Sequence, residues 1–115
     1  MSVETDFAAA LNTVMNERLF PDVAPQDIAI PYATYQVVAQ IPFNAIAGAP
    51  NIWNTTIQLD IFAHAFSVLV TWKAAARAAV RSAFGDTALE LVIRHGFDPE
   101  PGLHRVSMDW QISHG

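Results

Sequence analysis

The feature that most constrains this chain is a strict alternation of apolar and polar side chains in two separate segments. Successive side chains of a β-strand point to opposite faces, so such alternation predicts a strand with one buried face. Residues 103–113 form the longer segment and residues 55–61 the shorter one. The predicted buried faces consist of His104, Val106, Met108, Trp110 and Ile112 in the longer segment, and Thr55, Ile57, Leu59 and Ile61 in the shorter. Both strands must therefore pack one face against a second layer.

Two further segments have the composition of strands. Residues 32–41 are rich in β-branched and aromatic side chains and end before Pro42, and residues 88–95 have a similar character. Residues 42–51 are expected to form a loop and residues 96–102 a turn. The prolines in residues 19–31 predict an ordered connection or short extended pieces.

Three-and-four spacing of apolar residues predicts two helices, over residues 3–18 and 67–84. Ser2 and Ser67 are the expected N-caps, because a serine hydroxyl accepts from a free amide of the first turn. Gly85 is the expected left-handed C-terminal residue of the second helix. The expected buried positions are Val3, Phe7, Ala10, Leu11, Val14 and Met15 in the first helix, and Val68, Trp72, Ala75, Ala76, Ala79, Val80 and Ala83 in the second.

The order helix, two strands, helix, two strands defines the expected fold. It predicts an α+β architecture with an antiparallel sheet of about four strands and two helices packed on one face. A chain of 115 residues is expected to form a single domain over residues 1–115.

Composition narrows the classes of function. Hydrophobic residues make up 52% of the chain and charged residues 15%, which favours burial of apolar surface by self-association or by a partner. A net charge of −5 opposes non-specific binding to nucleic acid or an anionic membrane. Cysteine is absent, so neither disulfides nor a thiolate metal site is expected. No apolar run is long enough for a membrane helix and the acidic start is unlike a signal peptide, so a soluble cytoplasmic location is expected.

No arrangement of residues predicts a catalytic, cofactor-binding or metal site. The glycines match no phosphate-binding or dinucleotide-binding motif, and the serines match no nucleophile elbow. His64, His95, His104 and His114 have no metal-ligand spacing. Asp60 and Asp109 are expected to form surface ion pairs with Arg105, and Asp98 and Glu100 to be solvated. Lys73, Arg77 and Arg81 recur at four-residue intervals and predict a solvated basic helix face.

Three blocks taken in order resemble the tail-completion or tail-terminator family of long-tailed bacteriophages and prophages. The first contains Leu19–Gln26, Pro31, Tyr32, Tyr35 and Gln36; the second contains Ile57–Ala63 and Ala74–Val80; the third is Gly102–Ile112. The proline-bearing turn at residues 98–102 departs from the acidic, threonine-containing turn expected for the family.

The resemblance implies a non-enzymatic structural subunit of the virion tail, without cofactor, that is assembled in the bacterial cytoplasm. It implies a sixfold ring that terminates the tail tube or joins the tail to the head, with DNA passing through the hole. The implied partners are other copies of the chain, the tail-tube protein and head-tail connector proteins. Four apolar residues in or beside the loop 42–51 are the expected interface: Phe43, Ile46, Ile52 and Trp53.

Two alternatives use the same order of elements. The first is a small dimeric α+β barrel that binds an apolar ligand in a pocket containing His104 and Trp110. The second is a small enzyme with a site around Asp60, His64 and Arg105.

Overall fold

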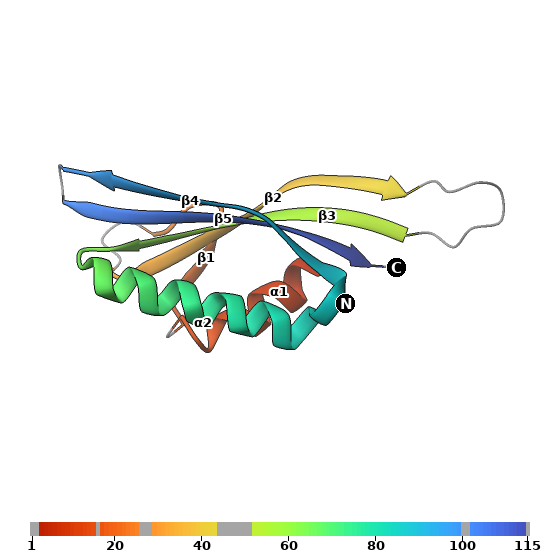
Figure 1. Cartoon of the computed structure of the whole chain (residues 1–115), viewed down its shortest axis with the longest axis horizontal. Helices are drawn as coiled ribbons and strands as arrows, with labels where there is room; N and C mark the ends of the chain where they lie inside the picture. Colours follow the sequence, from red (N-terminus) through yellow and green to blue (C-terminus); the bar gives the residue numbers. More distant parts are fainter. Residues whose placement is uncertain (1–2, 16, 26–28, 44–51, 100–101, 115) are drawn as a thin grey trace.

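The computed structural model describes residues 3–15, 17–25, 29–43, 52–99 and 102–114. These residues form two helices, a short 3-10 turn and five strands, in an α+β arrangement (Figure 1). The elements are α1 (Val3–Asn12), β1 (Leu19–Pro21), β2 (Tyr32–Phe43), β3 (Ile52–Ala63), α2 (Phe66–Phe84), η1 (Gly85–Thr87), β4 (Ala88–Asp98) and β5 (Leu103–His114). Neither described helix is long and apolar enough to cross a membrane.

The four long strands form the predicted antiparallel sheet, and β1 adds a fifth strand in parallel. The strand order is β1-β2-β3-β5-β4, with Leu59 of β3 opposite Met108 of β5. Leu19–Pro21 pairs in parallel with β2, so the sheet is mixed rather than purely antiparallel. The amide of Ala33 donates to Arg18 O and that of Asp22 to Tyr35 O, which anchors both ends of β1. Pro21 is tolerated because β1 lies at the edge of the sheet.

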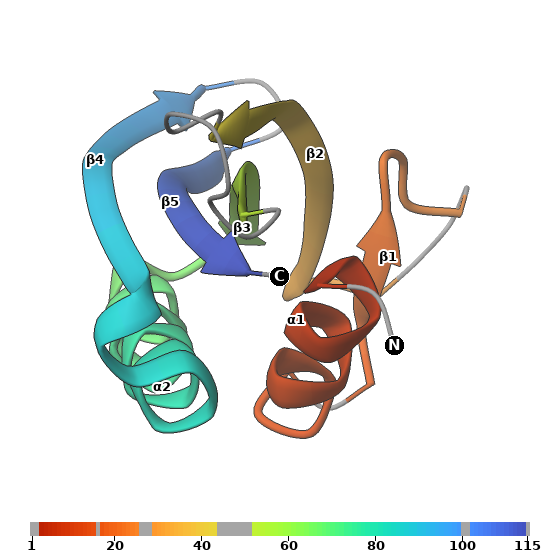
Figure 2. The same ribbon diagram turned by 90° about the vertical axis from the view of Figure 1, so that its right-hand side faces the viewer.

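Both helices cover the same face of the sheet, as the alternation predicts (Figure 2). The ring of Phe7 from α1 lies between the layers, with ring centroids 5.8 Å from Trp110 and 6.4 Å from Phe84. The sheet side of the core contains all but one of the predicted residues, and these are buried: Thr55, Ile57, Leu59, Ile61, Val106, Met108, Trp110 and Ile112. The exception is His104, which is only partly buried.

Helix α1 ends at Asn12, earlier than the predicted residue 18. Residues 13–15 continue as turns in which the amide of Met15 donates to Leu11 O, and Met15 is still buried. Glu17 then adopts a positive φ of 60°, which ends the helical path and directs the chain into β1. The predicted cap Ser2 lies outside the described residues.

Helix α2 begins one residue before the predicted start. Ala65 is the N-cap and makes no side-chain capping bond, so the prediction that Ser67 caps this helix is wrong. Leu69, which the prediction did not include in the buried stripe, is buried, whereas Val68 is only partly buried and Ala83 is exposed. Gly85 ends the helix at the predicted position with φ 57°, and its amide donates to Arg81 O.

The strands extend further than the sequence predicts at two turns. In the predicted loop 42–51, Pro42 and Phe43 still pair with Trp53 and Ile52. In the predicted turn 96–102, β4 continues to Asp98 and β5 starts at Leu103. The β2–β3 hairpin thereby projects past the helices and contributes to a shape measuring 53 × 25 × 23 Å (Figure 1).

Candidate assembly surfaces

The end of the β2–β3 hairpin projects beyond the helical layer (Figure 1). Trp53, one of the predicted interface residues, lies on β3 and is 39% exposed, and Ile41 on β2 is 59% exposed. Phe43 and Ile52 form the last described pair of the hairpin. The fourth predicted residue, Ile46, lies outside the described residues. Apolar side chains therefore remain uncovered on this hairpin.

A polar cluster marks the point where the hairpin leaves the body. Gln40 Nε2 donates to Glu4 Oε1 of α1 at 2.9 Å and to Thr55 Oγ1 at 3.3 Å. Thr55 Oγ1 also lies 2.6 Å from His114 Nε2, and Thr55 is completely buried. The cluster thus ties β2, β3, β5 and α1 together at the base of the hairpin.

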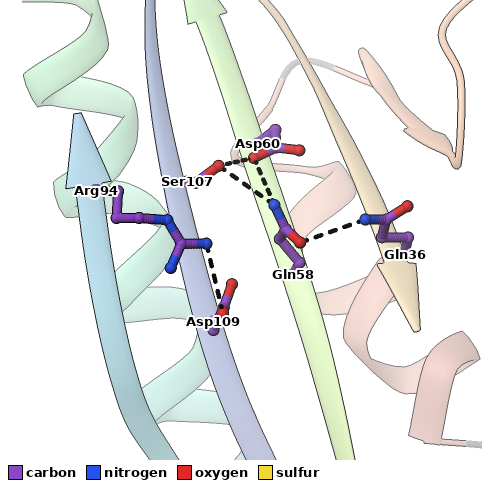
Figure 3. Close-up of polar contacts among 6 residues, drawn as sticks. All are labelled: Gln36, Gln58, Asp60, Arg94, Ser107 and Asp109. Atoms are coloured by element: carbon purple, nitrogen blue, oxygen red, sulfur yellow. Dashed lines mark hydrogen bonds and ion pairs between the residues drawn. The ribbon is translucent and has the colours of Figure 1, made fainter. Parts of the chain in front are cut away.

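The face of the sheet opposite the helices carries a polar network (Figure 3). Gln58 Nε2 donates to Asp60 Oδ1 at 3.3 Å, and Ser107 Oγ donates to the same carboxylate oxygen. Gln36 Nε2 donates to Gln58 Oε1 at 3.3 Å. The network extends across β2, β3 and β5, and its donors and acceptors satisfy each other, as structural polar surfaces do.

The expected ion pairs of Arg105 with Asp60 and Asp109 are wrong. Arg94 of β4 approaches Asp109 instead, with Nη2 3.6 Å from Oδ2 (Figure 3). The side chain of Arg105 lies beside Gly96 instead. A Cβ atom added to Gly96 would lie 3.7 Å from Nη2 of Arg105. Within the described residues, Asp109 Oδ1 is buried without a hydrogen-bond partner.

The predicted solvated basic face of α2 is partly engaged with β4. Arg77 donates to both carboxylate oxygens of Glu90, at 2.8 and 3.1 Å. Lys73 Nζ lies 3.2 Å from His95 Nε2. Arg81 is exposed and has no side-chain partner among the residues that the structure describes. Only the end of the basic row is therefore fully solvated.

The residues proposed for an enzyme site do not form one in the described chain. His64 Nδ1 lies 3.3 Å from Gly102 O, whereas Asp60 bonds to Gln58 and Ser107. Among the residues that were placed, no three His, Asp or Glu side chains are grouped so that they could hold a metal ion.

His104 and Trp110 are not brought into one pocket either. His104 lines a shallow groove of about 310 Å³ together with Phe66 and Phe97. Trp110 is 3% exposed and packs against Phe7 in the core. The arrangement expected of an apolar-ligand barrel is therefore not formed by these two residues.

Comparisons with known proteins agree with this account of a structural chain. The family described as "Tail completion protein gp17" matches residues 7–114. A solved structure titled "Virion of native gene transfer agent (GTA) particle" contains a chain with the same fold, with a TM-score of 0.65 at 14% identity; the match covers 97% of this chain and 93% of that one. No curated protein matches the sequence. Because the family match spans nearly the whole sequence, this chain belongs to the tail completion protein gp17 family of structural phage tail proteins.

Proposed function

We propose that copies of this chain form a closed ring, sixfold in symmetry, that terminates the tail tube or joins the tail to the head. The observation that carries the proposal is the family match over residues 7–114. In this role the whole chain, residues 1–115, acts as a single domain. It works without catalysis or cofactor.

The exposed apolar hairpin supports an assembly role. Trp53 and Ile41 are both exposed on the same hairpin, and a protein with 15% charged residues has little charged surface to surround them. We assign Phe43, Ile46, Ile52 and Trp53 to the contact with a neighbouring subunit or with a tail partner. Burial of such a patch is what stabilises most permanent interfaces.

The partners follow from the position of such a ring. Other copies of the chain form the ring, the tail-tube protein lies on one side of it, and head-tail connector proteins lie on the other. Genomic DNA passes through as cargo, which suits a chain of net charge −5 because like charges do not hold the duplex. Assembly takes place in the bacterial cytoplasm, and the finished protein resides in the virion tail.

Deletion of the gene from the phage or prophage that encodes it tests the proposal. The expected result is a loss of complete particles, with tails of undefined length or tails that do not join heads in electron micrographs. A plasmid copy of the wild-type gene should restore complete particles. Normal particles from the deletion strain would contradict the proposed function.

A further inference from the structure

The two lateral sides of the molecule differ in charge. Figure 2 shows α2 and β4 on one side of the fold and α1 and β1 on the other. We define the basic flank as the outer side of α2 and β4, which includes Phe66, Lys73, Arg81, Leu91 and Phe97. We define the acidic flank as the segment around β1 that contains Glu17, Asp22 and Val23.

The basic flank combines positive charge with uncovered apolar side chains. Phe66, Leu91 and Phe97 are each about half exposed. Glu90 is already paired with Arg77, which leaves Arg81 and Lys73 as the cations of this side that face no carboxylate in the described chain. Asp86, after the end of α2, and Asp98, the last residue of β4, are the acidic exceptions.

β4 is also an edge strand that lacks a partner on its outer side in the described fold. It is 11 residues long, which is long for an unprotected edge, because such edges offer a row of free backbone groups to another chain. The register shift between Glu90 and Val92 places Leu91 in a bulge, where it is 48% exposed. This edge therefore offers both hydrogen-bonding groups and apolar contact.

The acidic flank has the opposite chemistry. Glu17 and Asp22 are exposed, and the described residues provide neither carboxylate with a partner. The nearby cation, Arg18, is only partly exposed and directs its Nη1 toward Pro31 O at 3.5 Å. Val23 follows Asp22 and is 80% exposed, which makes it the most exposed large hydrophobic residue described.

We propose that the basic flank of one copy docks on the acidic flank of the next copy. This inference rests on the proposed ring and names the surfaces that close it. Two acidic flanks would repel each other, whereas the cations Lys73 and Arg81 attract the carboxylates of an acidic flank and fix the orientation of the neighbours. A contact between unlike surfaces is the head-to-tail contact that a ring requires. The apolar side chains of both flanks become buried in this contact.

Cysteine crosslinking tests the orientation, since the natural chain has no cysteine. Two full-length variants, Leu91→Cys and Val23→Cys, are oxidised separately and as a mixture at high protein concentration, because a disulfide forms only between closely apposed chains. The expected result is a covalent dimer in the mixture, with at least roughly tenfold less dimer in either variant alone. Efficient dimers from Leu91→Cys alone would mean that β4 edges pair symmetrically, and this would overturn the proposal. The absence of dimer from the mixture would overturn it as well.

Charge exchange tests the chemistry independently. One variant combines Lys73→Gln with Arg81→Glu, and the other combines Glu17→Lys with Asp22→Asn. Each alone should lower the crosslinked fraction roughly tenfold, because like charges then meet in the contact. The variant with all four changes has the natural net charge of −5, since the changes of −3 and +3 cancel, and should recover crosslinking. A lack of any effect from the separate variants would overturn the role of charge.

Failure of this inference can be distinguished from failure of the proposed function. The deletion experiment depends only on whether the protein is needed for complete particles. Crosslinking that fails while deletion still abolishes particles would reject the flank pairing and leave the proposed function standing. Circular dichroism of every variant confirms that the fold is retained before the crosslinked fractions are compared.

Discussion

Trp110 is the residue whose contribution to the core can be measured most directly. It is 3% exposed, and its ring lies 5.8 Å from that of Phe7. We predict that Trp110→Ala lowers the free energy of unfolding by about 3–5 kcal/mol, because it removes a large aromatic side chain and leaves a cavity. Urea denaturation of the variant measures the change.

Trp53 provides a matched control for this substitution. Its side chain is 39% exposed on the projecting hairpin, so Trp53→Ala should cost less than half as much as Trp110→Ala. Equal losses at the two positions would mean that the helix-covered face of the sheet is not the main core.

The Arg77–Glu90 pair has good geometry but is accessible to water. The side chains are 41% and 24% exposed, and water screens an ion pair in such a position. We predict that a double-mutant cycle of Arg77→Met and Glu90→Gln gives a coupling free energy below about 1 kcal/mol. A coupling of about 3 kcal/mol would show that the pair behaves as a buried one.

At the scale of elements, the start of α2 offers a test of capping. Ala65 is the N-cap and its side chain cannot accept a hydrogen bond from the first turn. We predict that Ala65→Ser raises the free energy of unfolding by about 0.5–1 kcal/mol, measured by thermal or urea denaturation.

Ser67 serves as the control for that prediction. It lies inside α2, and its carbonyl accepts from Thr71 Oγ1 at 3.0 Å. Ser67→Ala should therefore change stability by less than about 0.5 kcal/mol. If Ser67→Ala lowers the free energy of unfolding by more than Ala65→Ser raises it, Ser67 rather than Ala65 is the N-cap.

The sheet could be predicted from sequence because its signal is periodic and local. Alternation in residues 55–61 and 103–113 identifies β3 and β5 and their buried faces, and these two strands pair directly with each other in the sheet. The ends of the helices could be predicted less accurately than the strands. They depend on single backbone conformations, such as the positive φ of Glu17, that the residue type does not announce because few residues other than glycine adopt them.

Features that depend on contacts between residues far apart in the chain could not be predicted from the sequence either. β1 has three residues, too few for a periodic pattern, and is fixed by its parallel partner β2. The partner of Asp109 depends on the register shift in β4, which brings Arg94 rather than Arg105 within reach. Of the predicted interface residues, Trp53 is exposed on the projecting hairpin, and its place in an interface stays a prediction.

At the scale of the whole molecule, the hairpin and the flanks have separate tests. We predict that Trp53→Glu leaves the folded domain intact but reduces the number of complete particles by at least roughly tenfold, because a charge at an apolar contact is costly to bury. Trp53→Phe keeps the apolar contact and should support nearly normal particle numbers. Particle counts in electron micrographs of a complemented deletion strain provide the measurement.

If Trp53→Glu and the wild-type chain give equal particle numbers, the hairpin is not part of the assembly surface. The flank pairing would be unaffected by that outcome, since its residues lie on α2, β4 and the segment around β1.

The location and symmetry of the chain in purified particles would show whether it forms the proposed ring. Electron cryomicroscopy with averaging about the tail axis measures both in one experiment. Our account predicts a single closed ring of six copies at the end of the tail tube or at its junction with the head. Copies distributed along the tube, or particles that are complete without the chain, would contradict it.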